Sequence, residues 1–172
     1  MPSPKNSLND CQIQLIDSPI GIFKTYWRGD LLCRLEFSDL PKFVLTEQHN
    51  PLEPCSAGCT TLQQELEQYF LGKLTHFKTR TAPQGTPFQK SVWQQLTQIP
   101  YGQTRSYGEV ARMVGNPKAA RAIGMANNRN PIPVLFPCHR VIGAKGDLVG
   151  FGGGLDRKTH LLELEKNARI NC

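Results

Sequence analysis

Three helix starts follow one another closely in the second half of the chain. Thr86-Pro-Phe-Gln89 and Ser106-Tyr-Gly-Glu109 are capping boxes, in which a hydroxyl residue is followed three positions later by Gln or Glu. The first box also has proline at the first helical position, where the missing amide hydrogen costs nothing. Asn116-Pro117 predicts a third helix, running from 118 to 126. Starts this close together leave room only for short helices joined by tight turns.

The second and third of these helices form a helix-turn-helix pattern. Gly115 supplies the glycine expected in the turn between them. The third helix is nearly smooth, because only Lys118 and Arg121 project far from a surface of small residues, namely Ala119, Ala120, Ala122, Gly124 and Ala126. A smooth helix can approach DNA closely, although small residues also suit tight packing inside a core.

The distribution of charge favours the DNA interpretation. Residues 86–172 hold 12 Lys and Arg against 5 Asp and Glu, a net charge of +7, whereas residues 1–85 hold 8 against 9, a net charge of −1. A basic half indicates a polyanionic partner, and nucleic acid is the commonest one. A basic surface that is merely solvated would give the same count.

The first half of the chain is predicted to form a small sheet covered by one helix. Segments 21–27 and 31–37 flank the turn triplet Arg28-Gly-Asp30, which predicts a β-hairpin. A capping box at Thr61-Leu-Gln-Gln64 then begins a helix that Gly72 ends.

A linker-like segment, Thr79–Gly85, separates two predicted domains: an N-terminal sheet-containing domain, 1–85, and a C-terminal helix-turn-helix domain, 86–172. Within the second domain, Val134–Phe136 is predicted to form a short buried strand. Residues 141–149 resemble a hairpin, and Asp156 is expected to cap the last helix.

The cysteines and the apolar segments indicate the environment in which the protein is expected to work. Six cysteines without a secretory signal at the N-terminus favour reduced thiols and a cytoplasmic location. No run of 18 apolar residues is present, so no membrane span is expected. Cys55 and Cys59 could begin a zinc site, but no second pair stands at a matching spacing, so we expect no metal and leave this pair open.

The tetrapeptide Pro137-Cys-His-Arg140 is the strongest candidate for chemistry. A cysteine nucleophile reacts as its thiolate, and a histidine can take the proton. In an extended segment Cys138 and His139 would point to opposite sides, so either the backbone turns here or a water molecule bridges the two groups. A buried, inert cysteine would also fit the dipeptide alone. The preceding residues 127–133 are rich in turn formers, and Asn130 could tie that turn to the backbone around Cys138.

Residues 130–141, Asn-Pro-Ile-Pro-Val-Leu-Phe-Pro-Cys-His-Arg-Val, resemble the active-site signature of the O6-alkylguanine-DNA alkyltransferases. The resemblance extends over most of 86–172, through motifs at Thr86–Phe88, Pro100–Gln103, Ser106–Tyr107, Gly115–Gly124, Gly150–Gly154, Arg157–Lys158, Leu161–Leu162 and Glu165. It implies an α+β protein with an N-terminal ribonuclease-H-like α/β unit. A mainly helical, winged-helix-like DNA-binding domain that carries the active site would follow.

The same resemblance implies a suicide reaction and assigns roles. Cys138 would accept an alkyl group from O6-alkylguanine, and from O4-methylthymine, in double-stranded DNA, once per molecule. His139 would be the water-linked base, Glu165 the carboxylate that orients it, and Asn130 the hinge. Tyr107 would donate to the flipped base and Arg121 would fill the vacated stack. Further contacts to DNA or substrate would come from Gln89, Asn116, Ala120, Ala122, Gly124, Val141, Gly152 and Gly153.

The resemblance implies no cofactor and no metal, and we expect a monomer that contacts DNA and no membrane. Phe151 stands where many members of the family have tyrosine, Gly152 where some have serine, and His160 where tryptophan is frequent. These departures bear on the breadth of substrates. Two rival functions stay open: a sensor that binds DNA lesions without transfer, and a cysteine hydrolase that uses Cys138 and His139 with turnover.

Overall fold

The computed structural model describes residues 8–39 and 56–170, which form an α+β protein. After a short 3-10 helix η1 (Leu8–Asp10), an antiparallel sheet is built from β1 (Gln12–Ile16), β2 (Ile22–Arg28) and β3 (Leu31–Ser38), in that spatial order. The expected hairpin is confirmed, because β2 pairs with β3 across the turn. Strand β1 was not expected from the sequence.

Helix α2 (Ala57–Phe70) covers the sheet and begins five residues before the predicted start. The N-cap is Ser56, whose hydroxyl accepts a hydrogen bond from the Cys59 amide at 3.2 Å. Thr61 instead lies inside the helix and donates to the Ala57 carbonyl. The predicted end is confirmed, since Gly72 follows the helix with a φ of +72°, a conformation that suits glycine.

Two of the three helix starts in the second half are confirmed. Both capping boxes form, at the start of α3 (Pro87–Leu96) and of α4 (Tyr107–Met113). The third prediction was wrong by two residues, because α5 (Ala120–Asn128) begins after Ala119 without a side-chain cap. The carbonyl of Asn116 accepts the Ala119 amide in a turn, so Asn116 precedes the helix and does not cap it.

The predicted strand at Val134–Phe136 was also wrong. This segment is a turn in which Val134 has a φ of +74° and the Phe136 amide donates to the Ile132 carbonyl. The turn leads into the 3-10 helix η2 (Cys138–Arg140).

The predicted hairpin over 141–149 does not form as paired strands. Strand β5 (Val141–Ile142) pairs in parallel with β4 (Arg105–Ser106), and the following loop closes through a hydrogen bond from the Gly143 amide to the Asp147 carbonyl. The last helix, α6 (Leu155–Ile170), contains Asp156 in its first turn, so Asp156 is not the residue that precedes it.

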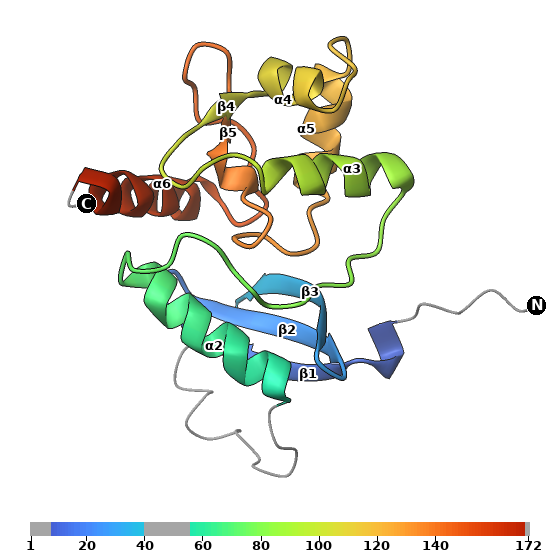
Figure 1. Cartoon of the computed structure of the whole chain (residues 1–172), viewed down its shortest axis with the longest axis vertical. Helices are drawn as coiled ribbons and strands as arrows, with labels where there is room; N and C mark the ends of the chain where they lie inside the picture. Colours follow the sequence, from blue (N-terminus) through green and yellow to red (C-terminus); the bar gives the residue numbers. More distant parts are fainter. Residues whose placement is uncertain (1–7, 40–55, 171–172) are drawn as a thin grey trace, which may run out of the picture.

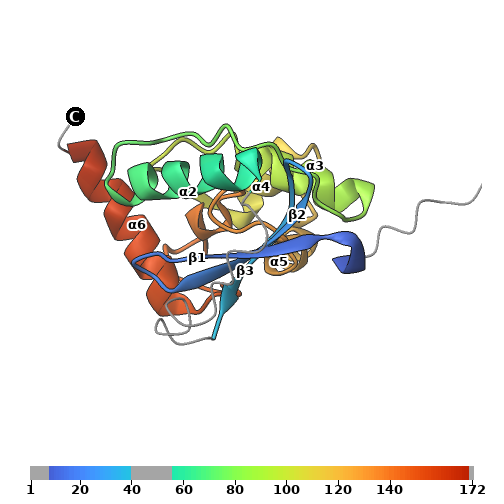
Figure 2. The ribbon, with the colours of Figure 1, turned by 90° about the horizontal axis from the view of Figure 1, so that it is seen from below.

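Two units are visible in Figure 1: the sheet with α2, and the group α3, α4 and α5, with α6 at one side. Figure 2 shows α2 lying along the sheet and α6 crossing near its end. The core of the sheet unit contains Trp27, Leu35 and Leu66, and it also takes in residues from far along the chain: Ile132, Val134, Leu135 and Leu161. The core of the helical unit contains Val92, Trp93, Val110, Ile123, Val141 and Cys138. The turn before Cys138 therefore contributes to the sheet unit's core, and Cys138 itself to the other.

The thiols do not all match the expectation of reduced cysteines. Cys11, Cys33 and Cys138 are free, but Cys59 is disulfide-bonded. A cystine sulfur is not the thiolate that zinc requires. Cys55, the other member of the suggested pair, lies outside the described residues. Within 8–39 and 56–170, no helix is long and apolar enough to span a membrane.

Candidate active site

Asn130 fixes the turn that positions Cys138. Its side-chain amide donates to the Phe136 carbonyl at 2.7 Å, and its side-chain oxygen accepts from the Ile132 amide at 3.0 Å. The same Phe136 carbonyl accepts from the Cys138 amide at 2.7 Å. The sequence prediction that Asn130 ties this turn together is confirmed.

Cys138 lies at a cavity of about 180 Å³ between the two units. The wall on the C-terminal side includes Asn130 together with Asn127, Asn128, Phe151, Gly152 and Gly153. The other wall is strand β3, through Arg34, Leu35, Glu36 and Phe37. Cys138 is 6% exposed, so its sulfur is reached through this cavity and not from the open surface.

His139 and Glu165 form a buried pair next to the cysteine. The 3-10 helix turns the backbone at Cys138, as one of the two sequence alternatives required, and directs His139 toward α6. There His139 Nε2 lies 2.8 Å from Glu165 Oε1, and both side chains are fully buried. Because a carboxylate only accepts, Nε2 carries the hydrogen and Nδ1 keeps its lone pair. Nδ1 is buried and has no hydrogen-bond partner among the described residues.

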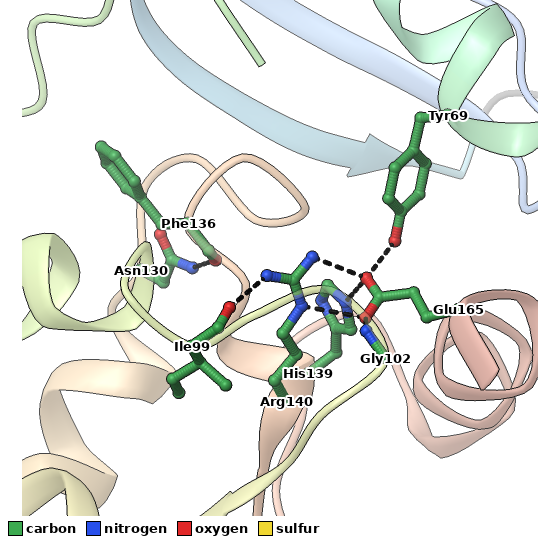
Figure 3. A network of polar contacts seen from close by, with 8 residues as sticks. All are labelled: Tyr69, Ile99, Gly102, Asn130, Phe136, His139, Arg140 and Glu165. Atoms are coloured by element: carbon green, nitrogen blue, oxygen red, sulfur yellow. Dashed lines mark hydrogen bonds and ion pairs between the residues drawn. The ribbon is translucent and has the colours of Figure 1, made fainter. Parts of the chain in front are cut away.

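Glu165 accepts hydrogen bonds from both units, as Figure 3 shows. Arg140 donates through Nε to Oε2 and through Nη2 to Oε1, both at 2.9 Å, and Gly102 donates its amide to Oε2 at 3.0 Å. Tyr69 of α2 donates its hydroxyl to Oε1 at 2.7 Å. Burial alone would raise the pKa of Glu165, but the hydrogen bonds from His139 and Arg140 and the positive charge of Arg140 lower it well below its usual range. Glu165 is therefore ionised.

The environment of His139 keeps the imidazole neutral. Burial lowers the pKa of His139, and the charges of Arg140 and Lys158 act in the same direction. Glu165 opposes them without reversing the shift. A neutral imidazole whose Nε2 hydrogen is held by a carboxylate is prepared to accept a proton at Nδ1.

The Cys138 thiol is a weak acid in the folded protein. Burial raises its pKa to about 11, although the Asn130 side chain, the Lys158 charge and the backbone amides of Cys138 and His139 lower it in part. At neutral pH roughly one thiol in ten thousand would ionise unaided. The sulfur therefore needs a base at the moment of reaction.

Lys158 is a buried cation close to this sulfur. Its side chain is fully buried, and Nζ donates to the carbonyls of Val141 at 2.7 Å and Val149 at 2.9 Å. These two bonds connect α6 to the strand after the active-site helix and to the loop before Gly152. Burial lowers the pKa of Lys158, and Cys138 opposes that shift.

Tyr107 begins α4 and lies near Cys138 and Asn127, which line the cavity, but Tyr107 is not itself one of the lining residues. Its hydroxyl donates to the Val149 carbonyl at 3.2 Å. An added Cβ at Gly124 or Gly150 would lie 3.8 or 3.9 Å from this side chain, so Tyr107 packs against both α5 and the loop at 150. Burial, followed by the proximity of Cys138, raises the pKa of Tyr107, so its hydroxyl keeps its proton.

The remaining predicted contacts are distributed over several surfaces. On α5 and the turn before it, Arg121, Ala122 and Asn116 are exposed, and Ala120 and Gly124 are half-buried. The side chain of Gln89 is used in the capping box, where it accepts from the Thr86 amide. The side chain of Val141 lies fully buried in the core and does not line the cavity.

Several residues of the site were missed in the sequence. Lys158 could have been found, because it stands three and seven positions before Leu161 and Glu165 and so shares their buried helix face. Arg140 is in the quoted tetrapeptide, but its ion pair depends on a carboxylate 25 residues away. Tyr69 fits a plain core pattern and gives no signal at all. Asn127 also lines the cavity, and its buried side-chain oxygen has no partner among the described residues.

These features define a protein with a cysteine-centred site: a buried cysteine lies beside a His–Glu pair, is reached through a small cavity, and belongs to the same core as helices α4 and α5. Residues 87–167 match the family model described as "6-O-methylguanine DNA methyltransferase, DNA binding domain". The chain is 47% identical to the methylated-DNA–protein-cysteine methyltransferase of Mycobacterium leprae over 156 residues, 88% of this chain and 90% of that one. Its match to the Methanosarcina acetivorans protein of the same name is 61% over 102 residues, 59% of this chain and 65% of that one.

Solved structures agree with these matches. The crystal structure of the Mycobacterium tuberculosis O6-methylguanine methyltransferase superposes with a TM-score of 0.78 at 44% identity, over 92% of this chain and 94% of that one. Mycobacterium tuberculosis OGT in complex with DNA gives 0.79 at 45%, over 91% and 93%. The chain belongs to the methylated-DNA–protein-cysteine methyltransferase family.

Proposed function

We propose that this protein repairs DNA by moving an alkyl group from O6 of a damaged guanine to Cys138, once per molecule. The observation that carries the proposal is the position of Cys138 at the cavity, next to the buried His139–Glu165 pair. The names of its relatives supply the substrate class. Cys138 is present, which argues against a binding-only lesion sensor.

The reaction begins with the proton of the thiol. His139 takes it at Nδ1, directly or through one water molecule, and Glu165 stabilises the imidazolium through Nε2. Because the thiol is such a weak acid, we expect proton removal to be coupled to binding of the base in the cavity.

The sulfur then displaces guanine from the alkyl carbon. The bond from Sγ to carbon forms as the bond from carbon to O6 breaks, and the electron pair leaves with O6. Tyr107 donates its hydroxyl proton to the departing oxygen. The proton on His139 is released to solvent, and Tyr107 regains one, so the number of protons balances. The product is a thioether without a leaving group, and the protein is used up.

DNA contact is assigned to the helical unit. The relative solved with DNA has the same fold over 91% of this chain, and this half carries the net charge of +7. In the proposal α4 and α5 enter the minor groove, the damaged base flips into the cavity at a cost of a few kcal/mol, and Arg121 fills its place. In the same proposal the N-terminal unit is ribonuclease-H-like, the C-terminal unit is winged-helix-like, and the protein acts as a monomer.

The test is the mass of the intact protein after incubation with a duplex that contains O6-methylguanine. We expect an increase of one methyl group and no more, located by peptide mapping on Cys138. Cys138→Ala should gain nothing. Cys33→Ala is the matched control, because Cys33 is also a free and buried thiol, and this variant should react like the wild type. An unmodified wild-type protein would refute transfer, and turnover beyond one equivalent would favour a hydrolase.

A further inference from the structure

Glu165 is held by hydrogen-bond donors from both units of the protein. Of the five bonds that it accepts from the described residues, four come from the C-terminal unit, through Gly102, His139 and the two from Arg140. The fifth comes from Tyr69 on α2, a residue 96 positions earlier in the chain. Figure 3 shows the Tyr69 ring extending from α2 to the carboxylate on α6.

We propose that Tyr69 is a positioning residue of the active site, through which the N-terminal unit holds Glu165 and sets the strength of His139 as a base. This inference rests on the proposed function, because it concerns the base that serves Cys138. Tyr69 acts through Glu165 and touches neither the sulfur nor the base-binding cavity.

The physical reason lies in the oxygen that the two side chains share. Tyr69 and His139 both donate to Glu165 Oε1, at 2.7 and 2.8 Å. Each donor draws electron density from the carboxylate, so a bond from Tyr69 weakens the oxygen as an acceptor for the imidazole. Without the Tyr69 hydroxyl, Glu165 would stabilise the imidazolium more strongly, and His139 would protonate at a higher pH.

Tyr69 is a fixed donor over the whole working range of pH. Its side chain is fully buried. Burial, followed by the charge and hydrogen bond of Glu165, raises the pKa of Tyr69 well above its ordinary value. The rings of Phe77 and Tyr101 pack against it, with centroids 5.3 and 5.9 Å away. The hydroxyl therefore has one position and keeps its proton.

The titratable and charged groups around His139 come from several elements of the described chain. On its own element these are Cys138 and Arg140, and on α6 they are Glu165 and Lys158. Helix α2 contributes Tyr69 through the carboxylate, and the segment before β4 contributes Tyr101, over which Arg140 lies at 5.6 Å. Tyr69 is the tyrosine of this set whose hydroxyl donates to Glu165, and Tyr69→Phe removes that donor while every charge is kept.

The experiment compares Tyr69→Phe with the wild-type full-length protein in two measurements. The first is the single-turnover rate of methyl transfer from a saturating O6-methylguanine duplex as a function of pH. The second is the pH titration of the His139 imidazole by nitrogen NMR without DNA. We expect the acid limb of the rate profile and the His139 titration both to move up by about half a pH unit, the size that one hydrogen bond supports.

Phe77→Leu is the matched control, because it loosens the packing around Tyr69 and keeps the hydroxyl. It should lower stability and leave both pH values in place. 3-Fluorotyrosine at position 69, a stronger donor, should move them down, which keeps the test available should Tyr69→Phe fold poorly. Unchanged pH values in Tyr69→Phe, or an equal shift in Phe77→Leu, would overturn the proposal. The NMR titration needs no transfer, so it gives an answer even if the wild type forms no adduct and the proposed function fails.

Discussion

The two units of the molecule contribute to the active site in different ways. In the proposed reaction the C-terminal unit supplies the groups that react or transfer protons, Cys138, His139 and Tyr107. The N-terminal unit supplies a wall of the cavity through β3 and a hydrogen bond to the Glu165 carboxylate through Tyr69. A third connection is Arg157, which donates to the Ile20 carbonyl at 2.8 Å.

The turn before Cys138 shows what this division means. Its apolar side chains belong to the core of the N-terminal unit, and a backbone bond joins the Leu35 amide to the Pro131 carbonyl at 2.9 Å. The sulfur belongs to the core of the C-terminal unit. Cys138 is thus positioned from both sides, and the N-terminal unit is a structural part of the site even though the groups of the proposed reaction lie in the C-terminal unit.

The largest expected effect is that of Glu165→Gln, which removes the charge shared by the two units. Arg140 would stay buried without a counter-ion, and a broken buried ion pair costs about 3–5 kcal/mol. Urea unfolding at pH 7 measures this loss. Glu36→Gln is the control, because Glu36 pairs with Arg34 at the surface and such pairs contribute at most about 1 kcal/mol.

The effect of Glu165→Gln should also depend on pH in a defined direction. The folded-state pKa of Glu165 is depressed, so its contribution to stability is complete above the unfolded value of about 4.3 and is lost as the pH falls below it. The difference between variant and wild type should therefore shrink below about pH 4. A difference that stays constant down to pH 3 would show that Glu165 is not the ionised partner of Arg140.

Asn130→Ala should have the next largest effect, because it releases the turn that lies between the units. Two hydrogen bonds are lost, to the Phe136 carbonyl and from the Ile132 amide, at a cost of about 1–3 kcal/mol. Transfer should slow as well, since Phe136 also holds the Cys138 amide. Asn116→Ala, which removes an exposed side chain before α5, should change the unfolding free energy by less than about 0.5 kcal/mol. An equal loss of unfolding free energy in Asn116→Ala would indicate that Asn116 caps α5, as the sequence predicted.

Arg121→Ala should slow transfer from duplex DNA and leave the unfolding free energy unchanged. If Arg121 replaces the flipped base, its loss should slow transfer in duplex DNA by roughly tenfold, or about 1.4 kcal/mol, and leave the reaction with free O6-methylguanine base unaltered. The rates are compared at saturating duplex. Lys118→Ala, at an exposed position before the same helix, should weaken binding without slowing the saturated rate. If the rate fell equally on duplex DNA and on free base, Arg121 would not be the residue that replaces the flipped base.

The sequence predicted most where local rules decide the structure. The capping boxes at Thr86 and Ser106 and the hairpin around Gly29 depend on a few adjacent residues, and all three form. The predicted start of α5 was wrong because residues 116–119 form a separate turn, closed by a hydrogen bond from the Ala119 amide to the Asn116 carbonyl, and the helix begins only after it. Val134–Phe136 failed because three apolar residues suit a strand as well as a buried turn.

The site was predictable to the extent that it is contiguous in sequence. Asn130, Cys138 and His139 lie within ten residues. The sequence predicted that the Asn130 side chain would bond the turn to the backbone around Cys138. The contacts of Glu165 with Tyr69 and Arg140 depend on where α2 and α6 pack, which no local pattern specifies. The resemblance named Glu165, but neither the residues nor the resemblance indicated that the N-terminal unit bonds to it.

The smallest net effect is expected at Val134, where two contributions oppose each other. A β-branched residue with a φ of +74° is strained by about 1–2 kcal/mol, and glycine would relieve that strain. Val134→Gly also removes a side chain that is 1% exposed, worth about 1.5–3 kcal/mol. We expect a net loss of about 1 kcal/mol in urea unfolding. Val92→Gly, equally buried but inside α3, should lose about 3 kcal/mol or more, since glycine there also weakens the helix. Similar losses at both positions would show that the N-terminal core holds this turn without strain.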